Sequence, residues 1–582
     1  MLKRTLIALA LLAAGSLHAG AYLPATDPDN SIQSRTDTSD VVDFDINAFV
    51  GADTFYSAGY TGSSAIVANI EAGHGWDGHE SMSNLDHFLD LGTTASGEYD
   101  RHATWTAQVI AGTQGAGSST PATFQNGIAY DATLWSGAIA ESWNTVPNTY
   151  VTGFNINTFS NLLTPYQDAV YGNSTNGATA DVINSSWGSG GLNDGGDVIS
   201  MSLDALANDS GKTFVFSAGN AGSGPDNVGA PGSGYNSITV GAIGDKPSGF
   251  DTISSFSSRS PSSVYNPATD SVIPGATRAA VDIVAPGEDI VAAFYGGATG
   301  GFDGTAIPGD NLYSTGLNGT SFSAPTVAGG ATLVVDAARG LGVDAEGADG
   351  RVVKSILMNS ADKNILSTGD VPWNNGQFVN GSGVIETTQA LDYGLGAGSM
   401  NLDKAYTQLT GGTMGVAGLG SGNLGYVSTV GWDLGQVTEG TANEYYIAQQ
   451  LAAGTDLTVT LNWFIDVLQN GLANDFSGHS FDDLSLEVWK TIGGVADTLV
   501  AVSDTAYDNV EHLFFEITET AEYMIRVLWD GEVWDLADDA NSELYGLAWF
   551  GTAALIDTPV AIAPVWLLML LGALAMRRRL HA

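Results

Sequence analysis

The chain has 582 residues, of which 63 are acidic and 18 basic, so its formal net charge is -45. A surface this negative repels nucleic acid and anionic lipid, and a nucleic-acid-binding role is therefore excluded. Cysteine is absent, which excludes disulfides and thiol chemistry. Hydrophobic residues make up 44% of the chain, enough to bury the cores of roughly two to four domains.

The start of the chain has the order of regions of a secretory signal. Two basic residues at positions 3 and 4 precede an apolar run, and small residues near position 20 then offer a cleavage site. A buried first helix is the alternative. We expect residues 1–21 to be a signal peptide, and the polar, acidic residues 22–45 to be a short leader or linker.

Short apolar runs alternate with helical patterns from residue 46 to 408. Runs that are apolar throughout indicate strands buried on both faces, and the helices between them indicate parallel connections. The sequence therefore predicts an α/β fold with a parallel sheet for 46–408. The clearest runs are 65–70, 181–186, 213–218, 237–243 and 281–285, and the clearest helical patterns are 102–112, 200–208, 321–339 and 351–359.

A glycine-rich segment, residues 409–429, is predicted to be a linker. Beyond it the hydrophobic period changes to two, as in the run 457–463, where leucine, valine and tryptophan alternate with polar residues. This pattern predicts an antiparallel β-sandwich domain over residues 430–555. Because the linker separates two different hydrophobic periods, we expect two independent domains.

The far end of the chain, residues 556–582, contains an apolar stretch from 561 to 576 followed by three arginines. The stretch is slightly short for a stable membrane span, which needs ~20 residues. The arginines would stay on the cytoplasmic side. The sequence predicts a sorting or anchor segment, with transient membrane contact through 561–576.

Ser321 is the strongest candidate nucleophile. It follows a Gly-Thr turn and stands where a helical pattern of small and apolar residues begins. A serine at this place profits from exposed backbone N–H groups and from the positive end of the helix dipole. An ordinary N-cap serine is the alternative interpretation.

Three other segments supply partners for such a serine. His102 opens a helical pattern and is the candidate general base, because the serine needs a group that removes its proton. Asn220 ends an apolar strand, where its amide can donate to a developing oxyanion. Glu71 ends another apolar strand, and its carboxylate can orient a histidine.

These segments resemble those of the subtilisin-like serine peptidases. GTSFSAP is similar to the Gly-Thr-Ser-x-x-x-Pro nucleophile motif, HATWTAQVIAG to the histidine motif and SAGN to the oxyanion segment, in the family's order along the chain. The resemblance covers about 48–408. It implies a serine endopeptidase that cleaves proteins or peptides through an acyl-enzyme without a required cofactor, with Ser321 as nucleophile, His102 as base, Glu71 as acid and Asn220 as oxyanion donor.

The resemblance also implies substrate-binding residues. NSSWGSG is similar to the strand that pairs with the substrate backbone in this family. It implies that Ser186, Trp187 and Gly188 bind substrate on one side, and that Ser217 and Gly219 of the SAGN segment bind it on the other.

The chain departs from the family at several positions. The acid position has Glu71 where the family usually has aspartate, and Ala103 and Trp105 replace a glycine and a histidine of the histidine motif. Asp77 and Asp100 do not stand at a strand end, so Glu71 remains the predicted acid. A catalytically inactive, peptidase-like surface adhesin is the alternative.

The segment GHGWDGHES adds His74, Asp77, His79 and Glu80. Two histidines five apart with acids nearby could bind zinc in a metallohydrolase, but the spacing is not His-Glu-x-x-His. A polar loop lining the cleft is favoured, and no metal ligand is predicted. Calcium sites are frequent in the family, yet the acidic loops here contain no diagnostic calcium motif.

Two further resemblances concern the C-terminal part. Residues 430–555 resemble the pre-peptidase C-terminal domains of secreted bacterial peptidases, which implies a spacer or adhesion role. Residues 556–582 resemble the PEP-CTERM sorting signals of Gram-negative bacteria, although Pro-Glu-Pro is missing. That resemblance implies cleavage by an exosortase-like enzyme, and a place at the cell surface or outside the cell after transient anchoring in the inner membrane.

Overall fold

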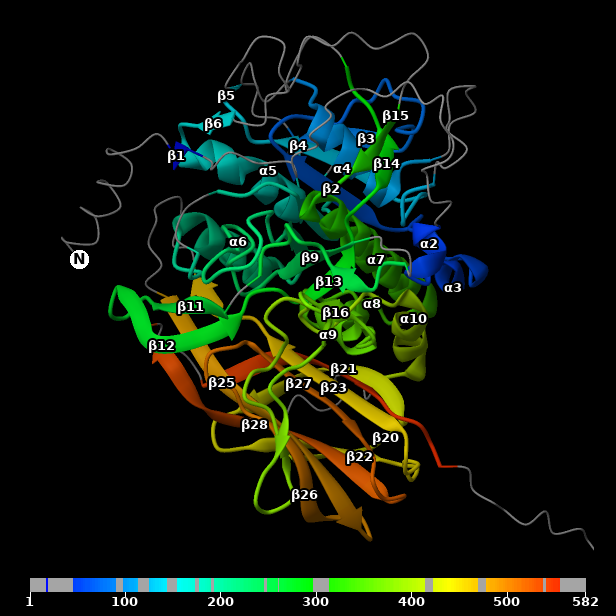
Figure 1. The fold of residues 1–582 in the computed structure, drawn as a ribbon, viewed down its shortest axis with the longest axis vertical. Coiled ribbons are helices and arrows are strands. Elements are labelled where there is room, and N and C mark those ends of the chain that lie inside the picture. The colour runs from blue at the N-terminus through cyan, green and yellow to red at the C-terminus, as the bar shows by residue number, and fades with distance from the viewer. Residues whose placement is uncertain are drawn as a thin grey trace, which may run out of the picture.

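Buried strands covered by helices form the first part of the molecule, and a β-rich part lies below them (Figure 1). The predicted signal apart from Leu17 and His18, most of the leader and the C-terminal sorting segment lie outside the described residues. This computed structural model describes residues 17–18, 45–89, 98–113, 125–143, 154–172, 177–189, 193–244, 249–259, 261–296, 313–413, 422–468, 478–536 and 541–554.

A sheet of ten described strands runs through the α/β part, in the order β17-β16-β10-β9-β8-β7-β2-β4-β3, with β13 paired to β9. The neighbouring strands from β9 to β3 run parallel, and the central ones are buried along almost their whole length. This confirms the predicted α/β fold with a mostly parallel sheet. The strands are β2 (Ile66–Glu71), β3 (Leu85–Leu89), β4 (Thr133–Ala138), β7 (Val182–Ser185), β8 (Thr213–Ser217), β9 (Ile238–Gly244), β10 (Thr252–Ile253), β13 (Ile283–Pro286), β16 (Leu366–Ser367) and β17 (Val371–Pro372).

Helices cover both faces of this sheet. The face that carries Val67, Val182 and Val215 packs against α4 (Arg101–Ala111), α7 (Thr320–Leu341), α9 (Gly350–Ser360) and α10 (Leu402–Gly411). The opposite face packs against α5 (Phe159–Tyr171) and α6 (Val198–Ser210). Short helices α2 (Ile46–Phe49), α3 (Ala52–Ser57) and α8 (Asp344–Gly347) lie at the edge of the first layer.

Smaller strand pairs are attached to the α/β part. They are β1 (Leu17–His18), β5 (Ser142–Trp143) and β6 (Phe154–Ile156) in one sheet, β11 (Pro261–Asn266) with β12 (Ser271–Ala279), and β14 (Ile290–Ala293) with β15 (Tyr313–Leu317). The hairpin β14–β15 packs over α4, where Trp105 Nε1 donates to Ser314 Oγ at 3.1 Å.

Two sheets enclose a second core in the C-terminal part. One has four antiparallel strands in the order β21-β29-β23-β27; the other has eight, in the order β18-β19-β26-β25-β28-β22-β20 with β24 paired to β25. The antiparallel region predicted after the α/β fold is thus present. Its strands are β20 (Gly422–Val427), β21 (Val430–Thr438), β22 (Ala442–Ile447), β23 (Asp456–Trp463), β24 (Asp466–Leu468), β25 (Gly478–Ile492), β26 (Val495–Ser503), β27 (Val510–Glu516), β28 (Glu522–Asp535) and β29 (Ser542–Phe550).

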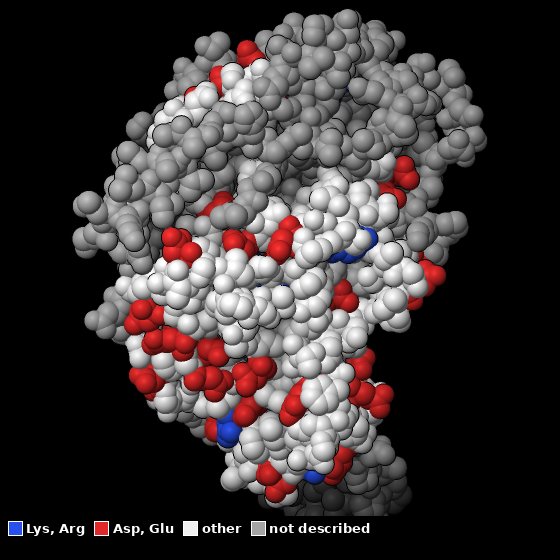
Figure 2. Space-filling view, turned by 60° about the vertical axis from the view of Figure 1, so that its left-hand side comes forward, with Lys and Arg blue, Asp and Glu red and all other residues white. Residues whose placement is uncertain are grey.

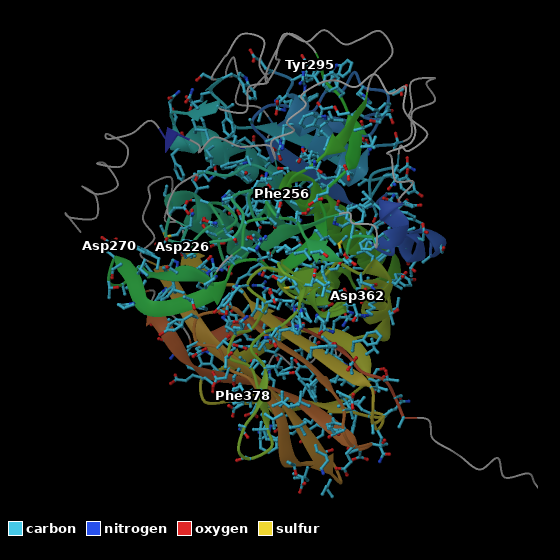
Figure 3. The ribbon with its side chains drawn as sticks, viewed as in Figure 1. Asp226, Phe256, Asp270, Tyr295, Asp362 and Phe378 are labelled. Atoms are coloured by element: carbon cyan, nitrogen blue, oxygen red, sulfur yellow. The ribbon has the colours of Figure 1, made fainter. Side chains whose placement is uncertain are left out.

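The eight-stranded sheet includes a hairpin from the α/β part, β18 (Phe378–Val379) with β19 (Ile385–Glu386). Strand β19 pairs in parallel with β26, so that Ile385 lies opposite Ala501. Phe378, labelled in Figure 3, lies over the sandwich, far below Asp362 of the α/β part. The two parts of the chain therefore share a sheet.

Helix α9 forms the main contact between the two parts. Thr460 Oγ1 on β23 donates to Asn359 Oδ1 at 2.9 Å, and Asn462 Nδ2 donates to the Arg351 carbonyl at 2.6 Å. Ser355 Oγ donates to the Gly546 carbonyl at 2.8 Å. The segment predicted as a linker is also structured in part, since α10 extends to 411 and β20 begins at 422.

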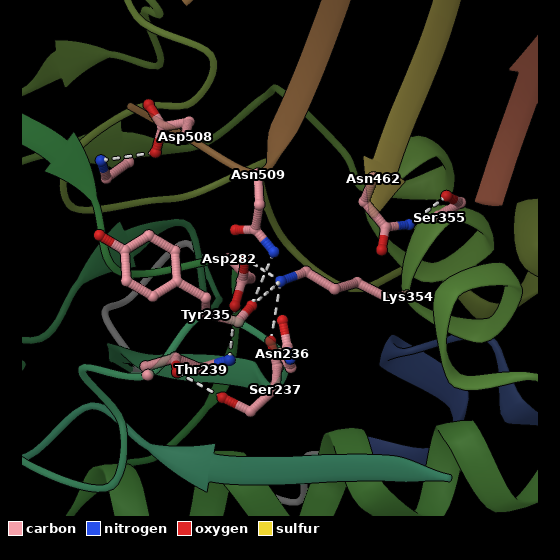
Figure 4. A network of polar contacts seen from close by, with 12 residues as sticks. Tyr235, Asn236, Ser237, Thr239, Asp282, Lys354, Ser355, Asn462, Asp508 and Asn509 are labelled. Carbon is pink, nitrogen blue, oxygen red and sulfur yellow. Dashed lines mark hydrogen bonds and ion pairs between the residues drawn. The ribbon is translucent and has the colours of Figure 1, made fainter. Parts of the chain in front are cut away.

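A buried polar network adds to this contact (Figure 4). Lys354 on α9 is 2% exposed; its Nζ lies 2.9 Å from Asp282 Oδ1 and donates to the Ser237 carbonyl at 2.8 Å. Asn509 of the sandwich donates to the Tyr235 carbonyl at 3.0 Å. These polar groups are buried at the contact between the two parts, where each needs its hydrogen-bond partner. The structure therefore differs from the expected pair of independent domains joined only by a linker.

Acidic side chains dominate the face shown in Figure 2, where only a few basic ones are visible. This agrees with the net charge of the sequence. Of the helices in the described residues, none is long and apolar enough to cross a membrane.

Candidate active site

The predicted site residues gather at one edge of the parallel sheet. Glu71 is the last residue of β2, Ser186 follows β7 directly and Ser217 is the last residue of β8. Since these strands are parallel neighbours, their carboxyl ends open at the same edge, where α/β proteins bind their ligands.

Glu71 is 1% exposed and uses both carboxylate oxygens. Its Oε2 lies 3.0 Å from His102 Nδ1, and its Oε1 accepts the backbone N–H of Ser186 at 2.6 Å. The other acids are engaged elsewhere: Asp77 accepts a hydrogen bond from the Tyr99 hydroxyl, and Asp100 accepts the N–H of Ala103. The carboxylate that meets the histidine is that of Glu71.

His102 is the second residue of α4, and Asp100 caps this helix. The cap is the usual one for an aspartate, whose side chain satisfies an N–H of the first turn. Burial raises the pKa of the Asp100 carboxyl, although the nearby His102 acts in the opposite direction. Of the two carboxyl groups near the histidine, that of Glu71 lies 3.0 Å from His102 Nδ1.

Ser321 is the second residue of α7 and is fully buried. Its Oγ donates to the Ser186 carbonyl at 3.2 Å. The backbone of Ser186 therefore contacts Glu71 through its N–H and Ser321 Oγ through its C=O. Trp105 lies near both sides of the site, with its ring 6.3 Å from that of His102 and 6.2 Å from that of Phe322.

Asn220 follows β8 and is oriented by the start of α7. Its Oδ1 accepts two hydrogen bonds from Thr320, one from the backbone N–H and one from the hydroxyl, both at 3.0 Å. With the oxygen occupied, the Nδ2 donor faces the Gly319 side of the turn: a Cβ atom at Gly319 would lie 3.5 Å from it. A glycine there keeps the space in front of the amide open.

The five predicted substrate-binding residues lie at the carboxyl ends of β7 and β8. The Trp187 side chain is 2% exposed and donates to the Tyr166 hydroxyl at 3.1 Å, so only its backbone is placed to meet a substrate. Gly219 has a φ of 99°, and its N–H donates to Thr320 Oγ1 at 3.1 Å. Gly188 is half-buried and Ser217 is buried.

The loop from His74 to Glu80 packs into an aromatic cluster. The His79 ring contacts that of Tyr313, and the Tyr313 hydroxyl donates to Glu80 Oε1 at 2.9 Å. The His74 ring lies 5.0 Å from that of Phe88. In the part of the chain that the structure describes, no three His, Asp or Glu side chains are grouped closely enough to hold a metal ion.

Two functional contacts escape sequence reasoning. Thr320 orients Asn220, and the Ser186 peptide groups bind Glu71 and Ser321. The Gly-Thr-Ser run could have drawn attention to the threonine. The second contact has no sequence signal, because backbone groups donate and accept regardless of side-chain type.

A family model described as the subtilase family matches residues 79–398, more than half of the chain, and the chain therefore belongs to the subtilase family. His102, Asn220 and Ser321 fall inside the matched region, whereas Glu71 precedes it. No curated protein gives a significant match.

Solved structures resemble the chain only in part. A protease from Pseudoalteromonas arctica is 17% identical, with a TM-score of 0.41; the match covers 62% of this chain and 93% of that one. The protease domain of PatA, solved as a serine-to-alanine mutant, is 22% identical, with a TM-score of 0.40; that match covers 60% of this chain and 96% of that one.

Proposed function

We propose that the protein is an exported serine endopeptidase that hydrolyses peptide bonds of proteins through an acyl-enzyme. The observation that carries this proposal is the connected set at the sheet edge. Glu71 bonds His102, and the same Glu71 is linked through the Ser186 backbone to Ser321. An acid, a base and a serine at a helix start form the set of groups that acyl transfer needs.

The proposed mechanism assigns one role to each of these residues. Ser321 Oγ attacks the scissile carbonyl carbon while His102 takes its proton, and the histidine later gives this proton to the leaving amine. Glu71 holds the Nδ1–H and stabilises the imidazolium. The amide of Asn220 and the backbone N–H of Ser321 bind the oxyanion, and water then hydrolyses the ester by the reverse sequence.

The remaining parts of the proposal rest on the sequence. The protein supplies the nucleophile, the base, the acid and the oxyanion donors, so the reaction requires no cofactor; bound calcium is possible but unproven. Residues 1–21 and 556–582 support export, transient membrane contact and cleavage by an exosortase-like enzyme. The sandwich, similar to pre-peptidase C-terminal domains, serves as a spacer or adhesion module.

Labelling with a fluorophosphonate, followed by peptide mapping, tests the proposal. We expect the label on Ser321, and we expect Ser321→Ala to lose both labelling and hydrolysis while its thermal unfolding is unchanged. Ser323→Ala is the matched control, because Ser323 is equally buried two residues further along the same helix. Folded protein that is never labelled would instead support the inactive adhesin. Activity lost with a chelator but not with the serine reagent would support a metallohydrolase.

A further inference from the structure

A row of buried polar side chains crosses the sheet two residues before Glu71. Ser136 on β4, Asn69 on β2 and Asn184 on β7 are register partners in parallel strands, so they lie side by side on one face. Each of the three is 0% exposed. Buried polar groups cost free energy unless they are hydrogen-bonded, so the partners of this row indicate what it does.

Asn69 joins three elements of the fold through its single amide. Its Nδ2 donates to Thr106 Oγ1 at 2.9 Å and to the Ala103 carbonyl at 3.2 Å, both on α4. Its Oδ1 accepts a hydrogen bond from Asn184 Nδ2 at 2.9 Å. The amide bridge, defined as Thr106, Asn69 and Asn184, therefore ties helix α4 to strands β2 and β7.

The amide bridge runs directly beneath the acid–base contact. Asn69 stands two residues before Glu71, on the same face of β2. Asn184 stands two residues before Ser186, whose N–H binds the acid, and Thr106 lies one turn beyond the general base, with Oγ1 3.1 Å from that residue's carbonyl oxygen. The amide bridge thus holds β2, β7 and α4 close to the acid–base contact. Its residues lie two positions from Glu71 and from Ser186, and one helical turn from His102.

We propose that Asn69 is a positioning residue, which holds α4 at the distance from β2 that lets Glu71 Oε2 bond His102 Nδ1. The inference rests on the proposed function. Without this amide, the Glu71–His102 contact itself and apolar packing would hold α4 against β2, and apolar packing does not specify direction. A displacement of about 1 Å in a catalytic geometry costs ~10²-fold in rate. Asn69 acts through α4 and does not itself act on the substrate.

Asn69→Val tests the proposal, because valine has a comparable volume and removes all three hydrogen bonds. We expect kcat to fall ~10- to 100-fold with KM almost unchanged. We also expect the NMR resonance of the His102 Nδ1 proton, bonded to Glu71 in the wild type, to shift or to broaden away. A normal kcat with an unchanged resonance would overturn the proposal, as would a rise in KM alone. Asn69→Ser, which supplies one hydroxyl in place of the amide, should have a kcat between those of the wild type and the valine variant. It serves as the test if the valine variant does not fold.

Asn443→Val is the matched control for lost stability. Asn443 is also 0% exposed and also donates from Nδ2 to two partners, the Gln436 carbonyl and the Tyr545 hydroxyl, but it lies in the sandwich. We expect a similar loss of stability with kcat and the His102 resonance unchanged. Equal kinetic losses in both variants would reduce Asn69 to a stability role. If the wild type itself is inactive, the proposed function fails, yet the resonance still reports whether Asn69 sets the His102–Glu71 contact.

Discussion

Glu71 and Ser186 are joined across two neighbouring strands, since the carboxylate of the first accepts the backbone N–H of the second at 2.6 Å. The extra methylene of glutamate gives the side chain the length to reach this N–H while its other oxygen bonds His102. Two bonds fix the carboxylate plane, and a fixed carboxylate holds the histidine in one tautomer. The length of the Glu71 side chain thus fits the positions of both His102 and the Ser186 N–H.

Glu71→Gln should lower kcat ~10⁴-fold without unfolding the protein, because an amide cannot stabilise the imidazolium and can present its N–H side to the histidine. Glu71→Asp should be milder but still impaired, since the shorter chain does not span to both His102 and Ser186. Steady-state kinetics and thermal unfolding check this. Asp77→Asn is the control and should retain wild-type kcat; a large loss in that variant would contradict the assignment.

Asn220→Ala should lower kcat ~10²- to 10³-fold with little change in KM, because the amide is expected to donate to the oxyanion of the transition state. Asn227→Ala is the matched control for the loss of asparagine hydrogen bonds outside the site. Asn227 donates to the carbonyls of Ala221 and Gly222 in the loop beyond the site. A change mainly in KM would mean that Asn220 binds substrate in the ground state.

A chain ending at Gly411 should lose its fold and its labelling at Ser321. The truncation removes the groups that cover α9, including Thr460, and the Trp432 indole that donates to the Leu409 carbonyl. Uncovered buried polar groups and apolar surface both destabilise the α/β part. A chain ending at Ala554 keeps these groups and is the control. Solubility, circular dichroism and fluorophosphonate labelling measure the outcome. If the shortened chain is soluble and is labelled, the α/β part folds independently of the sandwich and this prediction is wrong.

Asp508 should make stability depend on pH. Burial raises the pKa of its carboxyl to about 7, despite the nearby Arg278. The folded state therefore holds this proton more tightly than the unfolded state, so the contribution to stability is present below pH ~4 and is lost as pH rises through about 7. Asp508→Asn should unfold with a free energy about 1 to 4 kcal/mol higher than the wild type at pH 8, and nearly equal at pH 4.

The amide of the asparagine variant can still accept the Ala279 N–H that Asp508 Oδ1 accepts at 3.2 Å. Denaturant titrations at both pH values measure the difference. Asp497→Asn, at an exposed position of β26, is the control and should give the same difference at both pH values. Equal free energies of unfolding for Asp508→Asn and the wild type at pH 8 would show that the ionised Asp508 carboxylate does not destabilise the folded protein.

Much of the α/β part could be predicted because its signals are local. The apolar run 65–70 corresponds to β2, and the helical pattern 321–339 lies within α7. Motif order brought Glu71, His102 and Ser321 into consideration together. In the structure their contacts to one another and to Ser186 lie at one sheet edge.

The contact between the two parts could not be predicted, because a polar residue in an alternating strand is normally taken to face water. Thr458, Thr460 and Asn462 alternate with apolar residues on β23, yet their exposed fractions are 9%, 0% and 0%. Thr460 and Asn462 bond to Asn359 and Arg351 of α9, more than 100 residues earlier in sequence. Burial on that face depends on tertiary pairing, which hydrophobic periodicity does not contain.

The hairpin β18–β19 also sets the order of events during synthesis. Ile385 leaves the ribosome 116 residues before Ala501, its partner on β26. Until then its strand edge is unpaired, and Phe378 and Val379, still 46% and 66% exposed in the finished fold, are open to other chains. The nascent chain therefore cannot complete the eight-stranded sheet from its amino end, and the pairing of β19 waits for the synthesis of β26.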